Sequence, residues 1–466
     1  MCYTVFMKKF TEATVKIPIP DALTALAEEC AFPLYLVGGA VRDFLAGFSP
    51  AKKPDFDVCA DAPEDKLISA AERAGMRAKS VYRRTGTVKL EDTNGTGYEF
   101  TRFRSDKYVR GIHTPSEIEF TSDIERDARR RDFCANAVYY EIKTGTLCDP
   151  LGGIGDIKRK TLRTVAPAKK VFGEDGLRLM RLARLSAETG FAPNADAIEG
   201  AREHALLLAD IAPERIFTEL MLLLRADKRH GVADAPYRGL CVLRETGVLN
   251  VLLPELALGD GMAQRSDFHD YDVLEHSLRC VKYAPEDVRL AALLHDVGKP
   301  FCIKRDGNAH AHAEEGALLT REILTRLKAP KRLATETEEL VRLHMRDYNL
   351  QMRESKLRRE LVHCYPLLPK LLALKQADYS ACKDDLSPAP AVLKWQTALT
   401  AMREEGVPFS QRELAVNGND AIAAGVPPQK VGNALAELLG YCAENGKRNE
   451  RGHLLSRLKK HYGKYD

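Results

Sequence analysis

Two short stretches near the N-terminus combine residue types that could bind a nucleotide and a divalent metal ion. The first is Leu36-Val37-Gly38-Gly39-Ala40-Val41-Arg42-Asp43, and the second is Asp55-Phe56-Asp57. Gly38 and Gly39 would let the backbone approach a phosphate closely, at the start of an expected helix whose first amides favour negative charge. Arg42 adds a forked donor that suits a phosphate group.

The two aspartates predict metal-dependent chemistry. On a strand, Asp55 and Asp57 would project from the same face, roughly 7 Å apart along the backbone. Two such carboxylates can hold one or two Mg²⁺ ions against a nucleoside triphosphate, which is the apparatus of phosphoryl transfer. Either stretch alone is uninformative, because Gly-Gly often marks a plain turn and Asp-x-Asp is often solvated surface. Their order and spacing together favour a catalytic site.

A third group of charged residues is spaced as on a helix. Asp175, Arg178, Arg181 and Arg184 follow one another in steps of three, which would place them along one ridge. A carboxylate and a guanidinium one turn apart can hydrogen-bond the Watson–Crick edge of a base. Such a ridge could select a nucleotide without a template, and a salt-bridged, solvent-exposed helix face is the alternative.

Three consecutive arginines, Arg129 to Arg131, precede Asp132. Like charges are costly to pack together unless an anion lies among them. We therefore expect Arg131 to contact an anionic ligand, and a structural ion pair between Arg131 and Asp132 is the alternative.

A separate set of metal-ligand types lies in the second half of the chain: His276, His295, Asp296 and Asp378. Imidazole and carboxylate groups together suit divalent transition metals, and we expect these four side chains to form a second metal site. His310 and His312 could add ligands or substrate contacts, or simply be exposed.

The elements that must position these residues divide the chain into an α+β part and a helical part. A helix predicted over residues 21–30 leads into an apolar strand at residues 35–37, and β-rich runs then alternate with helices up to residue 150. From Glu174 onward Leu/Ala/Arg-rich helical patterns continue, with proline-rich breaks. We expect an α+β domain whose sheet carries Asp55 and Asp57, followed by all-α domains.

Composition indicates an ordinary cytoplasmic protein. The 466 residues are enough for several domains, 45% are hydrophobic and 29% are charged. No apolar run reaches the ~20 residues that a membrane span needs, and the N-terminus lacks a secretory pattern. Eleven cysteines without CxxC pairs argue against a disulfide framework. Basic residues cluster at 126–131 and 158–170, which favours a polyanionic partner such as RNA, and also at 447–464, where a flexible end is the simpler interpretation.

With these motifs in place, the chain resembles the class II tRNA nucleotidyltransferases, the family that includes CCA-adding enzymes and bacterial poly(A) polymerases. The matching runs, in family order, are Gly38 to Asp43, Asp55-Phe56-Asp57, Arg130-Arg131-Asp132-Phe133 with Asn136-Ala137, Asp149-Pro150-Leu151-Gly152-Gly153, Glu174-Asp175 with Arg178, Glu214-Arg215-Ile216 and the region from Gly425 to Asn449. The resemblance implies a polymerase-β-like nucleotidyltransferase head at 1–165 and a helical neck for base selection and RNA binding at 166–255. A helical HD body at 256–385 and an RNA-binding helical tail at 386–466 would follow.

The resemblance also implies an activity and roles for residues. The activity would be Mg²⁺-dependent transfer of CMP and AMP from CTP and ATP to the 3′ end of tRNA. Asp55 and Asp57 would be catalytic metal ligands, and Gly38, Gly39, Arg42 and Arg131 would contact the nucleotide. Asp175 and Arg178 would read the base, supported by Arg181 and Arg184. Poly(A) addition, or addition of only A or CC, is the alternative within the family.

The second metal set resembles the HD phosphohydrolase superfamily. This resemblance implies a divalent transition metal held by His276, His295, Asp296 and Asp378, and hydrolysis of a phosphomonoester or a 2′,3′-cyclic phosphate. An alternative from another class is therefore a metal phosphohydrolase whose head only binds RNA. We expect no membrane partner, and the sequence leaves the oligomeric state open.

Overall fold

The computed structural model describes residues 10–49, 56–108, 116–265, 267 and 269–462. The chain divides into two compact units, Met1–Pro254 and Glu255–Asp466. Among the described helices, none is both long enough and apolar enough to cross a lipid bilayer. Asp55, one of the two aspartates expected to bind metal, lies outside the described residues.

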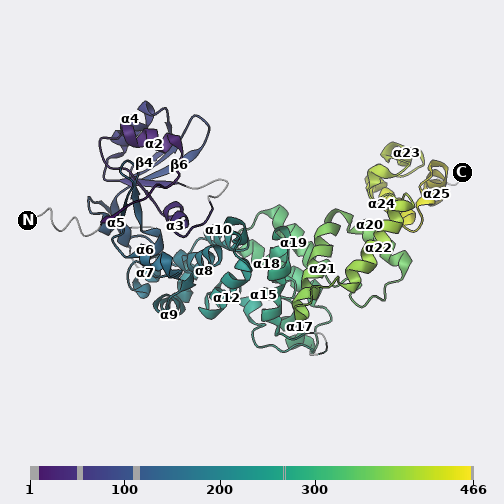
Figure 1. The fold of residues 1–466 in the computed structure, drawn as a ribbon. Coiled ribbons are helices and arrows are strands. Elements are labelled where there is room, and N and C mark those ends of the chain that lie inside the picture. The colour runs from purple at the N-terminus through teal and green to yellow at the C-terminus, as the bar shows by residue number, and fades with distance from the viewer. Residues whose placement is uncertain (1–9, 50–55, 109–115, 266, 268, 463–466) are drawn as a thin grey trace, which may run out of the picture. The chain divides into compact units, whose positions relative to one another are not determined.

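The N-terminal unit is built on a mixed eight-stranded sheet (Figure 1). From edge to edge its strands are β1 (Phe10–Thr14), β10 (Thr146–Cys148), β9 (Tyr139–Glu141), β2 (Tyr35–Val37), β3 (Asp57–Ala60), β6 (Gly97–Arg102), β5 (Thr87–Glu91) and β4 (Arg77–Tyr82). Only β3 and β6 run parallel; the other described neighbours in this sheet are antiparallel. Two small pairs complete the strands: β7 (Arg104–Lys107) with β8 (Glu117–Phe120), and β11 (Thr161–Leu162) with β12 (Ala192–Pro193).

The centre of this sheet explains the position of Asp57. Strand β2 is apolar and buried at every residue, as expected for an inner strand. It pairs antiparallel with β3 so that Val37, its last residue, lies opposite Asp57, the first residue of β3. The chain turns at Gly38 immediately after Val37, so the glycine turn and Asp57 meet at the same end of the sheet.

The helices of the N-terminal unit fall into two groups. Those in the sheet region are α2 (Asp21–Glu29), α3 (Gly39–Leu45), α4 (Glu64–Arg73), α5 (Ile124–Arg129) and α6 (Gly153–Lys158). The following group is α7 (Ala168–Glu174), α8 (Leu177–Thr189), α9 (Ala195–His204), α10 (Pro213–Leu223), α11 (Asp227–His230), α12 (Ala235–Glu245) and α13 (Val248–Leu252). Two 3₁₀ turns, η2 (Cys134–Asn136) and η3 (Ala205–Asp210), join elements of this unit.

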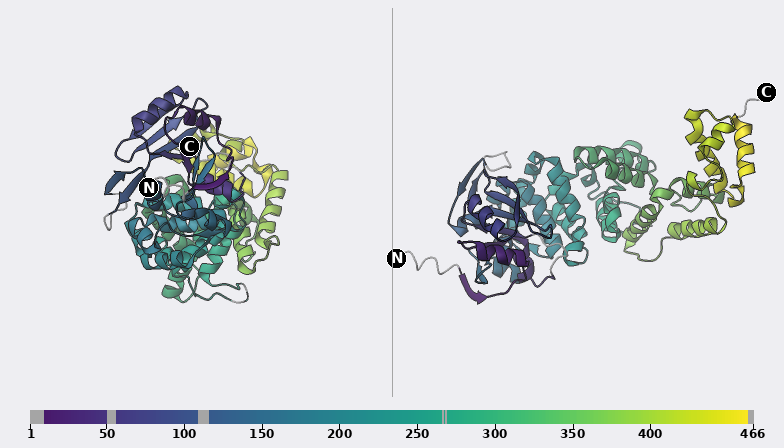
Figure 2. Two further views of the ribbon diagram at one scale, coloured as in Figure 1. Left: turned by 60° about the vertical axis from the view of Figure 1, so that its left-hand side comes forward. Right: turned by 90° about the horizontal axis from the view of Figure 1, so that it is seen from above.

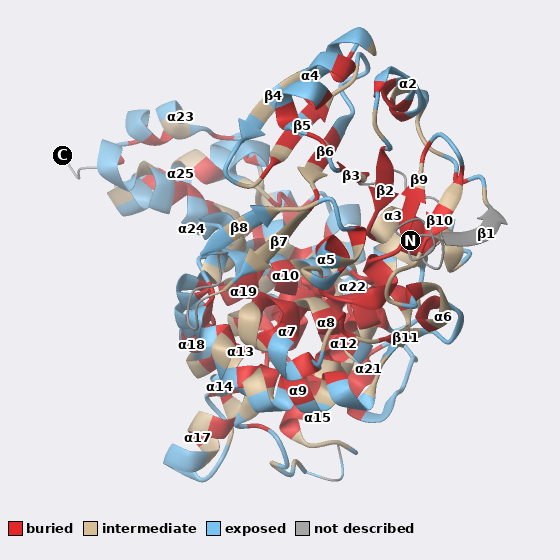
Figure 3. Ribbon diagram, turned by 90° about the vertical axis from the view of Figure 1, so that its left-hand side faces the viewer, coloured by how far each residue is buried: buried red, intermediate tan, exposed pale blue. Residues whose placement is uncertain are grey.

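Helix α8 is the centre of the second group. Figure 3 colours buried residues red, and nearly all of α8 is buried. It packs against α10 and α12. A Cβ built at Gly239 in α12 would lie 2.2 Å from Leu223 Cδ1 and 3.0 Å from Ala183 O, so only glycine permits this approach of α12 to α8.

The C-terminal unit is entirely helical among its described residues. Its helices are α14 (which begins at Pro254, as Pro254–Ala257), α15 (Val273–Tyr283), α16 (Arg289–Leu294), α17 (Lys299–Asp306), α18 (His312–Arg326), α19 (Lys331–Leu343), α20 (Glu354–His363), α21 (Leu368–Lys383), α22 (Pro390–Glu404), α23 (Gly418–Ala423), α24 (Val431–Ala443) and α25 (Arg451–Tyr462). Helices α23, α24 and α25, at the yellow end of the scale in Figure 2, share a small apolar core that includes Leu435, Leu438, Leu454 and Leu458.

The predicted fold class, an α+β head followed by helices, is confirmed. The predicted helix at 21–30 and the strand at 35–37 are present as α2 and β2. After Glu174 the described residues contain a single strand, the two-residue β12.

Candidate functional site

A polar pocket lies at the end of the sheet where β2, β3 and α3 meet α8. Its volume is about 400 Å³, and its lining includes Gly38, Gly39, Arg42, Asp57, Arg130, Arg131, Asp132, Asn136, Asp175, Arg178, Arg181, Arg184, Glu188, Arg215 and Arg229. Eight arginines therefore face four carboxylates. This excess of positive charge suits a polyanionic ligand such as a triphosphate.

Gly38 and Gly39 form one wall of the polar pocket. Gly38 has a φ of 84°, which side chains rarely adopt, and a Cβ built there would lie 3.2 Å from Asp57 Oδ2. A Cβ at Gly39 would lie 3.2 Å from Arg229 Nη2. Helix α3 begins at Gly39. Both glycines therefore keep the space around Asp57 and the arginines clear of side chains.

Arg42 is buried and is fixed by two polar partners. Its Nε and Nη2 donate to Asp43 Oδ1 at 2.8 and 2.5 Å, and its Nη1 donates to Asn136 Oδ1 at 2.7 Å. The other oxygen of Asp43 accepts a hydrogen bond from Arg229 Nη2 at 3.0 Å and lies 3.2 Å from His230 Nε2. Burial favours the neutral acid, but His230, Arg42 and Arg229 outweigh it and hold the pKa of Asp43 well below its ordinary value.

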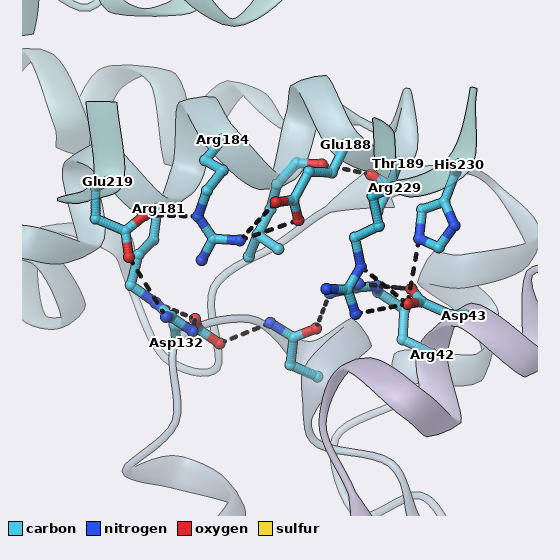
Figure 4. A network of polar contacts seen from close by, with 12 residues as sticks. Arg42, Asp43, Asp132, Arg181, Arg184, Glu188, Thr189, Glu219, Arg229 and His230 are labelled. Atoms are coloured by element: carbon cyan, nitrogen blue, oxygen red, sulfur yellow. Dashed lines mark hydrogen bonds and ion pairs between the residues drawn. The ribbon is translucent and has the colours of Figure 1, made fainter. Parts of the chain in front are cut away.

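A continuous polar network joins α3 to α8 (Figure 4). Asn136 Nδ2 donates to Asp132 Oδ1 at 3.0 Å, and Arg181 donates to Asp132 Oδ2 at 2.9 and 2.5 Å. Arg184 donates to Glu219 Oε2 at 2.6 Å and to both oxygens of Glu188 at 2.9 Å. Because each guanidinium has a fixed partner, the network holds the arginines in place before a ligand arrives.

Two arginines of the run at 129–131 are arranged around Asp127, not around the neighbouring Asp132. Fully buried Asp127 accepts hydrogen bonds from Arg130 Nε at 2.8 Å, Arg131 Nη2 at 3.1 Å and Tyr139 Oη at 2.7 Å. The alternative interpretation, an ion pair between Arg131 and Asp132, is therefore wrong, because Arg131 pairs with Asp127 and Asp132 pairs with Arg181 from α8. Arg131 still lines the polar pocket, as the ligand-contact interpretation requires.

The predicted ridge on α8 needs one correction. Arg178, Arg181 and Arg184 lie on α8, but Asp175 lies between α7 and α8 with extended backbone (φ −147°, ψ 106°). Its Oδ1 accepts a hydrogen bond from Leu177 N at 3.0 Å. Arg178 is buried and donates to the carbonyl oxygens of Val171 and Arg130 at 3.0 and 2.7 Å. The exposed-face alternative is therefore wrong for Arg178 and Arg184, which are 5% and 8% exposed.

In the C-terminal unit the four predicted metal ligands come together. His276 lies on α15 and Asp378 on α21, while His295 and Asp296 lie in the turn that follows α16 rather than on a helix. The Nε2 atom of His276 is 3.2 Å from that of His295, 3.0 Å from Asp378 Oδ1 and 3.5 Å from Asp296 Oδ2. All four side chains are buried.

Two further histidines lie beside these four. His312, the first residue of α18, and His344, which follows α19, are buried, and their Nε2 atoms are 3.2 Å apart. Together with His276, His295, Asp296 and Asp378 they are called here the His–Asp cluster. His310 is exposed. Burial and the neighbouring histidines lower the pKa of His344 to about 3, so its imidazole is neutral and able to bind a metal at neutral pH.

Several residues of both sites were given no role by the sequence. Arg215, Arg229 and Glu188 line the polar pocket, and Asn136 joins Arg42 to Asp132. Asn136 and Arg215 lie in runs that match the family, but no role followed for them from the sequence. Arg229 and Glu188 belong to no local pattern that differs from an ordinary charged helix. His344 likewise stands alone in the sequence, and only the packing of α19 against α16 brings it to Asp296.

Comparisons with known proteins agree with this architecture. A family model described as the poly A polymerase head domain matches residues 34–163, and one described as a probable RNA and SrmB-binding site of polymerase A matches residues 190–258. An HD domain model matches residues 273–381.

Among curated proteins, the A-adding tRNA nucleotidyltransferase of Deinococcus radiodurans is 33% identical over 427 residues, covering 86% of this chain and 90% of that protein. A multifunctional CCA protein of Xanthomonas campestris pv. campestris is 31% identical, covering 86% of this chain and 96% of that protein. A solved structure, the Bacillus stearothermophilus CCA-adding enzyme in complex with CTP, aligns over 95% of this chain and 97% of that chain with a TM-score of 0.67 and 26% identity.

The head fold and the curated relatives define a nucleotidyltransferase. The chain belongs to the family of tRNA nucleotidyltransferases and poly(A) polymerases, and it carries an HD domain. The expected enzyme class and family are thereby confirmed.

Proposed function

We propose that this nucleotidyltransferase adds CMP and AMP, from CTP and ATP, to the 3′ end of tRNA without a template. The observation that carries the proposal is the polar pocket, in which Asp57 and the glycine turn face the arginines and Asp175 within one cavity. The 3′-hydroxyl of the RNA would attack the α-phosphate of the bound nucleotide, and pyrophosphate would leave. Relatives named A-adding tRNA nucleotidyltransferase and multifunctional CCA protein support this assignment.

The residues of the polar pocket would have different roles in binding the metal ion and the triphosphate. Asp57, with Asp55, would hold Mg²⁺, which when bound supplies Lewis acidity toward phosphoryl oxygens. Gly38 and Gly39 leave room for the phosphates, and Arg42 and Arg131 contribute positive charge. Because these groups are already held by Asp43, Asn136 and Asp127, catalysis would come mainly from positioning and electrostatics.

Asp175 and Arg178 would select the base, and Arg181 and Arg184 would support them from the same side of the polar pocket. The side chains would provide acceptors and donors that match cytosine or adenine and reject guanine or uracil. Arg178 keeps its position through the carbonyl oxygens of Val171 and Arg130, which limits the orientations that its guanidinium can present.

The proposal is tested by incubating purified protein and Mg²⁺ with tRNA that lacks its 3′ end, with CTP and ATP supplied separately and together, and sequencing the products. Addition of C, C and A in that order is expected. Addition of only A or only CC, or of a long A tract, would assign one of the alternative activities. No addition to any acceptor, by protein that binds nucleotide, would contradict the proposal.

The proposed function also implies a domain organisation, a surface that contacts tRNA and a cellular location. We place the head at residues 1–165, the neck at 166–255, the HD body at 256–385 and the tail at 386–466. The basic residues of the neck and of α25 would contact the tRNA backbone. With a tRNA substrate, we expect the enzyme to act in the cytoplasm.

The HD domain supports a second activity, the hydrolysis of a phosphomonoester or a 2′,3′-cyclic phosphate. The observation in its favour is the convergence of His276, His295, Asp296 and Asp378 in one buried cluster, whose donor set suits a divalent transition metal. Asp296→Ala is expected to lose both metal and hydrolysis of a 2′,3′-cyclic nucleotide while nucleotide addition continues. Metal-free wild-type protein after purification without chelators would mean that the cluster is scaffold.

A further inference from the structure

Two arginines beside the glycine turn of the polar pocket share one carboxylate. Asp43 Oδ1 accepts hydrogen bonds from Arg42 Nε and Nη2, at 2.8 and 2.5 Å, and Asp43 Oδ2 accepts one from Arg229 Nη2, at 3.0 Å. Figure 4 shows both guanidinium groups meeting at this carboxylate. Because a guanidinium stays protonated, these three side chains together keep one positive charge that the carboxylate does not neutralise. The exposure of the two arginines decides which of them presents this charge to a ligand.

Arg229 is the more accessible of the two arginines. The side chain of Arg42 is 2% exposed, and each of its three nitrogens already donates to Asp43 or Asn136. The side chain of Arg229 is 31% exposed, and its Nη1 donates to none of the described residues. An arginine with a free edge can add hydrogen bonds to a phosphate without breaking those that hold it in place. Arg229 therefore presents the positive charge of the group to the polar pocket.

Arg229 and Asp57, the proposed metal ligand, lie on the two residues of the glycine turn. A Cβ built at Gly38 would lie 3.2 Å from Asp57 Oδ2. A Cβ built at Gly39 would lie 3.2 Å from Arg229 Nη2. Consecutive Cα atoms are ~3.8 Å apart, so the carboxylate and the guanidinium are neighbours in the polar pocket. A triphosphate whose α-phosphate faced a metal ion at Asp57 would have its outer phosphates within reach of Arg229.

Helix α11 is fixed in the position that brings Arg229 to the polar pocket. The ring of His230, the next residue, stacks on Phe48, with centroids 4.0 Å apart and an interplanar angle of 9°. His230 Nε2 also lies 3.2 Å from Asp43 Oδ2. Helix α11 packs against α8 as well. Because these contacts hold α11 beside the residues that follow α3, binding a ligand would order little further chain, which favours affinity.

We propose that Arg229 binds the outer phosphates of the incoming nucleotide and the pyrophosphate that leaves, while Asp43 holds its guanidinium in place. The inference rests on the proposed function and deepens it, because it names a group that distinguishes a nucleoside triphosphate from a monophosphate. The positive charge of Arg229 would offset the negative charge of the departing pyrophosphate.

The test compares Arg229→Gln with Lys228→Gln, which removes the same charge from an exposed neighbour on α11. The full-length proteins are titrated with ATP, inorganic pyrophosphate or AMP, in Mg²⁺ and without RNA, and the dissociation constants are measured by calorimetry. Arg229→Gln should weaken the binding of ATP and of pyrophosphate by about tenfold or more, because charge-assisted hydrogen bonds are lost. Binding of AMP, which lacks the outer phosphates, should not change. Lys228→Gln should match the wild-type protein for all three ligands.

A more conservative variant covers the case in which circular dichroism finds Arg229→Gln unfolded. Arg229→Lys keeps the charge beside Asp43 but loses the forked donor, so it should bind ATP several-fold more weakly, again without loss for AMP. Equal losses of ATP and AMP affinity would overturn the proposal and make Arg229 a structural partner of Asp43. Unchanged affinity for ATP and pyrophosphate would also overturn it.

Failure of the proposed function would look different. The same wild-type protein is incubated with CTP, ATP and tRNA that lacks its 3′ end. A protein that adds no nucleotide, but whose affinity for pyrophosphate falls in Arg229→Gln and not in Lys228→Gln, would contradict the proposed function and support the phosphate contact. A protein that adds nucleotides with the same kcat/KM in wild type and Arg229→Gln would support the function and overturn the contact.

Discussion

At the scale of single residues, several arginines of the polar pocket already form ion pairs with carboxylates of the protein before any ligand binds. Arg42 is held by Asp43, Arg131 by Asp127 and Arg181 by Asp132. Pairing each buried guanidinium offsets the cost of its desolvation, which an isolated buried charge would impose. The net excess of arginines remains available to phosphates.

Asp175 gives a prediction at this scale. If Asp175 and Arg178 read the base, Asp175→Ala should lower the preference for CTP and ATP over UTP and GTP, by about tenfold, because a good pair of base contacts discriminates by about 1–3 kcal/mol. The measurement is the ratio of kcat/KM values for the four nucleotides. Glu203→Ala, an exposed carboxylate on α9, is the control. An unchanged ratio in a less stable protein would make Asp175 purely structural.

At the scale of elements, the site depends on close approaches that side chains would prevent. Gly38 and Gly39 leave the space at the end of β2 free of side chains. Gly298 lets the turn after α16 pack directly against α18. Asp127 ties the end of α5 to Tyr139 in β9. Each contact joins segments that are distant in sequence and fixes a functional side chain.

The substitution Gly298→Ala tests whether the turn after α16 must pack directly against α18. Its Cβ would meet His312 O at 2.3 Å and Gly316 N at 2.6 Å, both backbone atoms, so one segment must move. We expect a loss of about 1–3 kcal/mol in the free energy of unfolding of the C-terminal unit, together with weaker metal binding. The single tryptophan, buried Trp395, reports unfolding in urea. Gly432→Ala has open space around its Cβ and should be neutral; equal stability of the two variants would contradict the packing argument.

Asp127 gives a pH-dependent prediction. Burial favours the neutral acid, but Arg130 and Arg131 outweigh it and lower the pKa of Asp127 to about 2. A carboxylate with a lowered pKa in the folded state stabilises the protein above its unfolded pKa, and this stabilisation is lost as the pH falls from about 4 towards 2.

Asp127→Asn should therefore cost on the order of 2 kcal/mol of unfolding free energy at pH 7, and less at pH 3. Urea denaturation of both proteins, followed by circular dichroism at the two pH values, measures the difference. Asp65→Asn, at an exposed ion pair with Arg83, is the control and should have little effect. A cost for Asp127→Asn that does not change with pH would contradict the ionised state assigned to this carboxylate.

The parts of the site that could be predicted from the sequence are those encoded locally. Gly38-Gly39 after an apolar run, and His295-Asp296 after another, are visible because neighbouring residues define them. The position of Asp175 was predicted wrongly. The three-residue spacing from Asp175 to Arg184 suggests one helix, but α7 ends before Asp175 and α8 begins after it. The break lies where the chain packs on η3, since a Cβ at Gly176 would lie 2.6 Å from Leu207 O. Arg229 and His344 reach their sites only through tertiary packing, which no local pattern encodes.

At the scale of the whole molecule, the two candidate sites belong to different compact units. The polar pocket is formed by residues before Pro254, and the His–Asp cluster by residues after it. Among the described residues, each site is formed by residues of its own unit alone. The two activities should therefore be separable by substitution.

The most direct test of the central claim is the rate of nucleotide incorporation into tRNA by Asp57→Asn, compared with wild type and with Asp296→Ala. Asp57→Asn conserves shape but removes the negative charge that a metal ion requires, so incorporation should fall by at least about a hundredfold while binding of tRNA persists. Asp296→Ala should incorporate at the wild-type rate. Incorporation near the wild-type rate by Asp57→Asn would contradict the assignment of the polar pocket as the catalytic site.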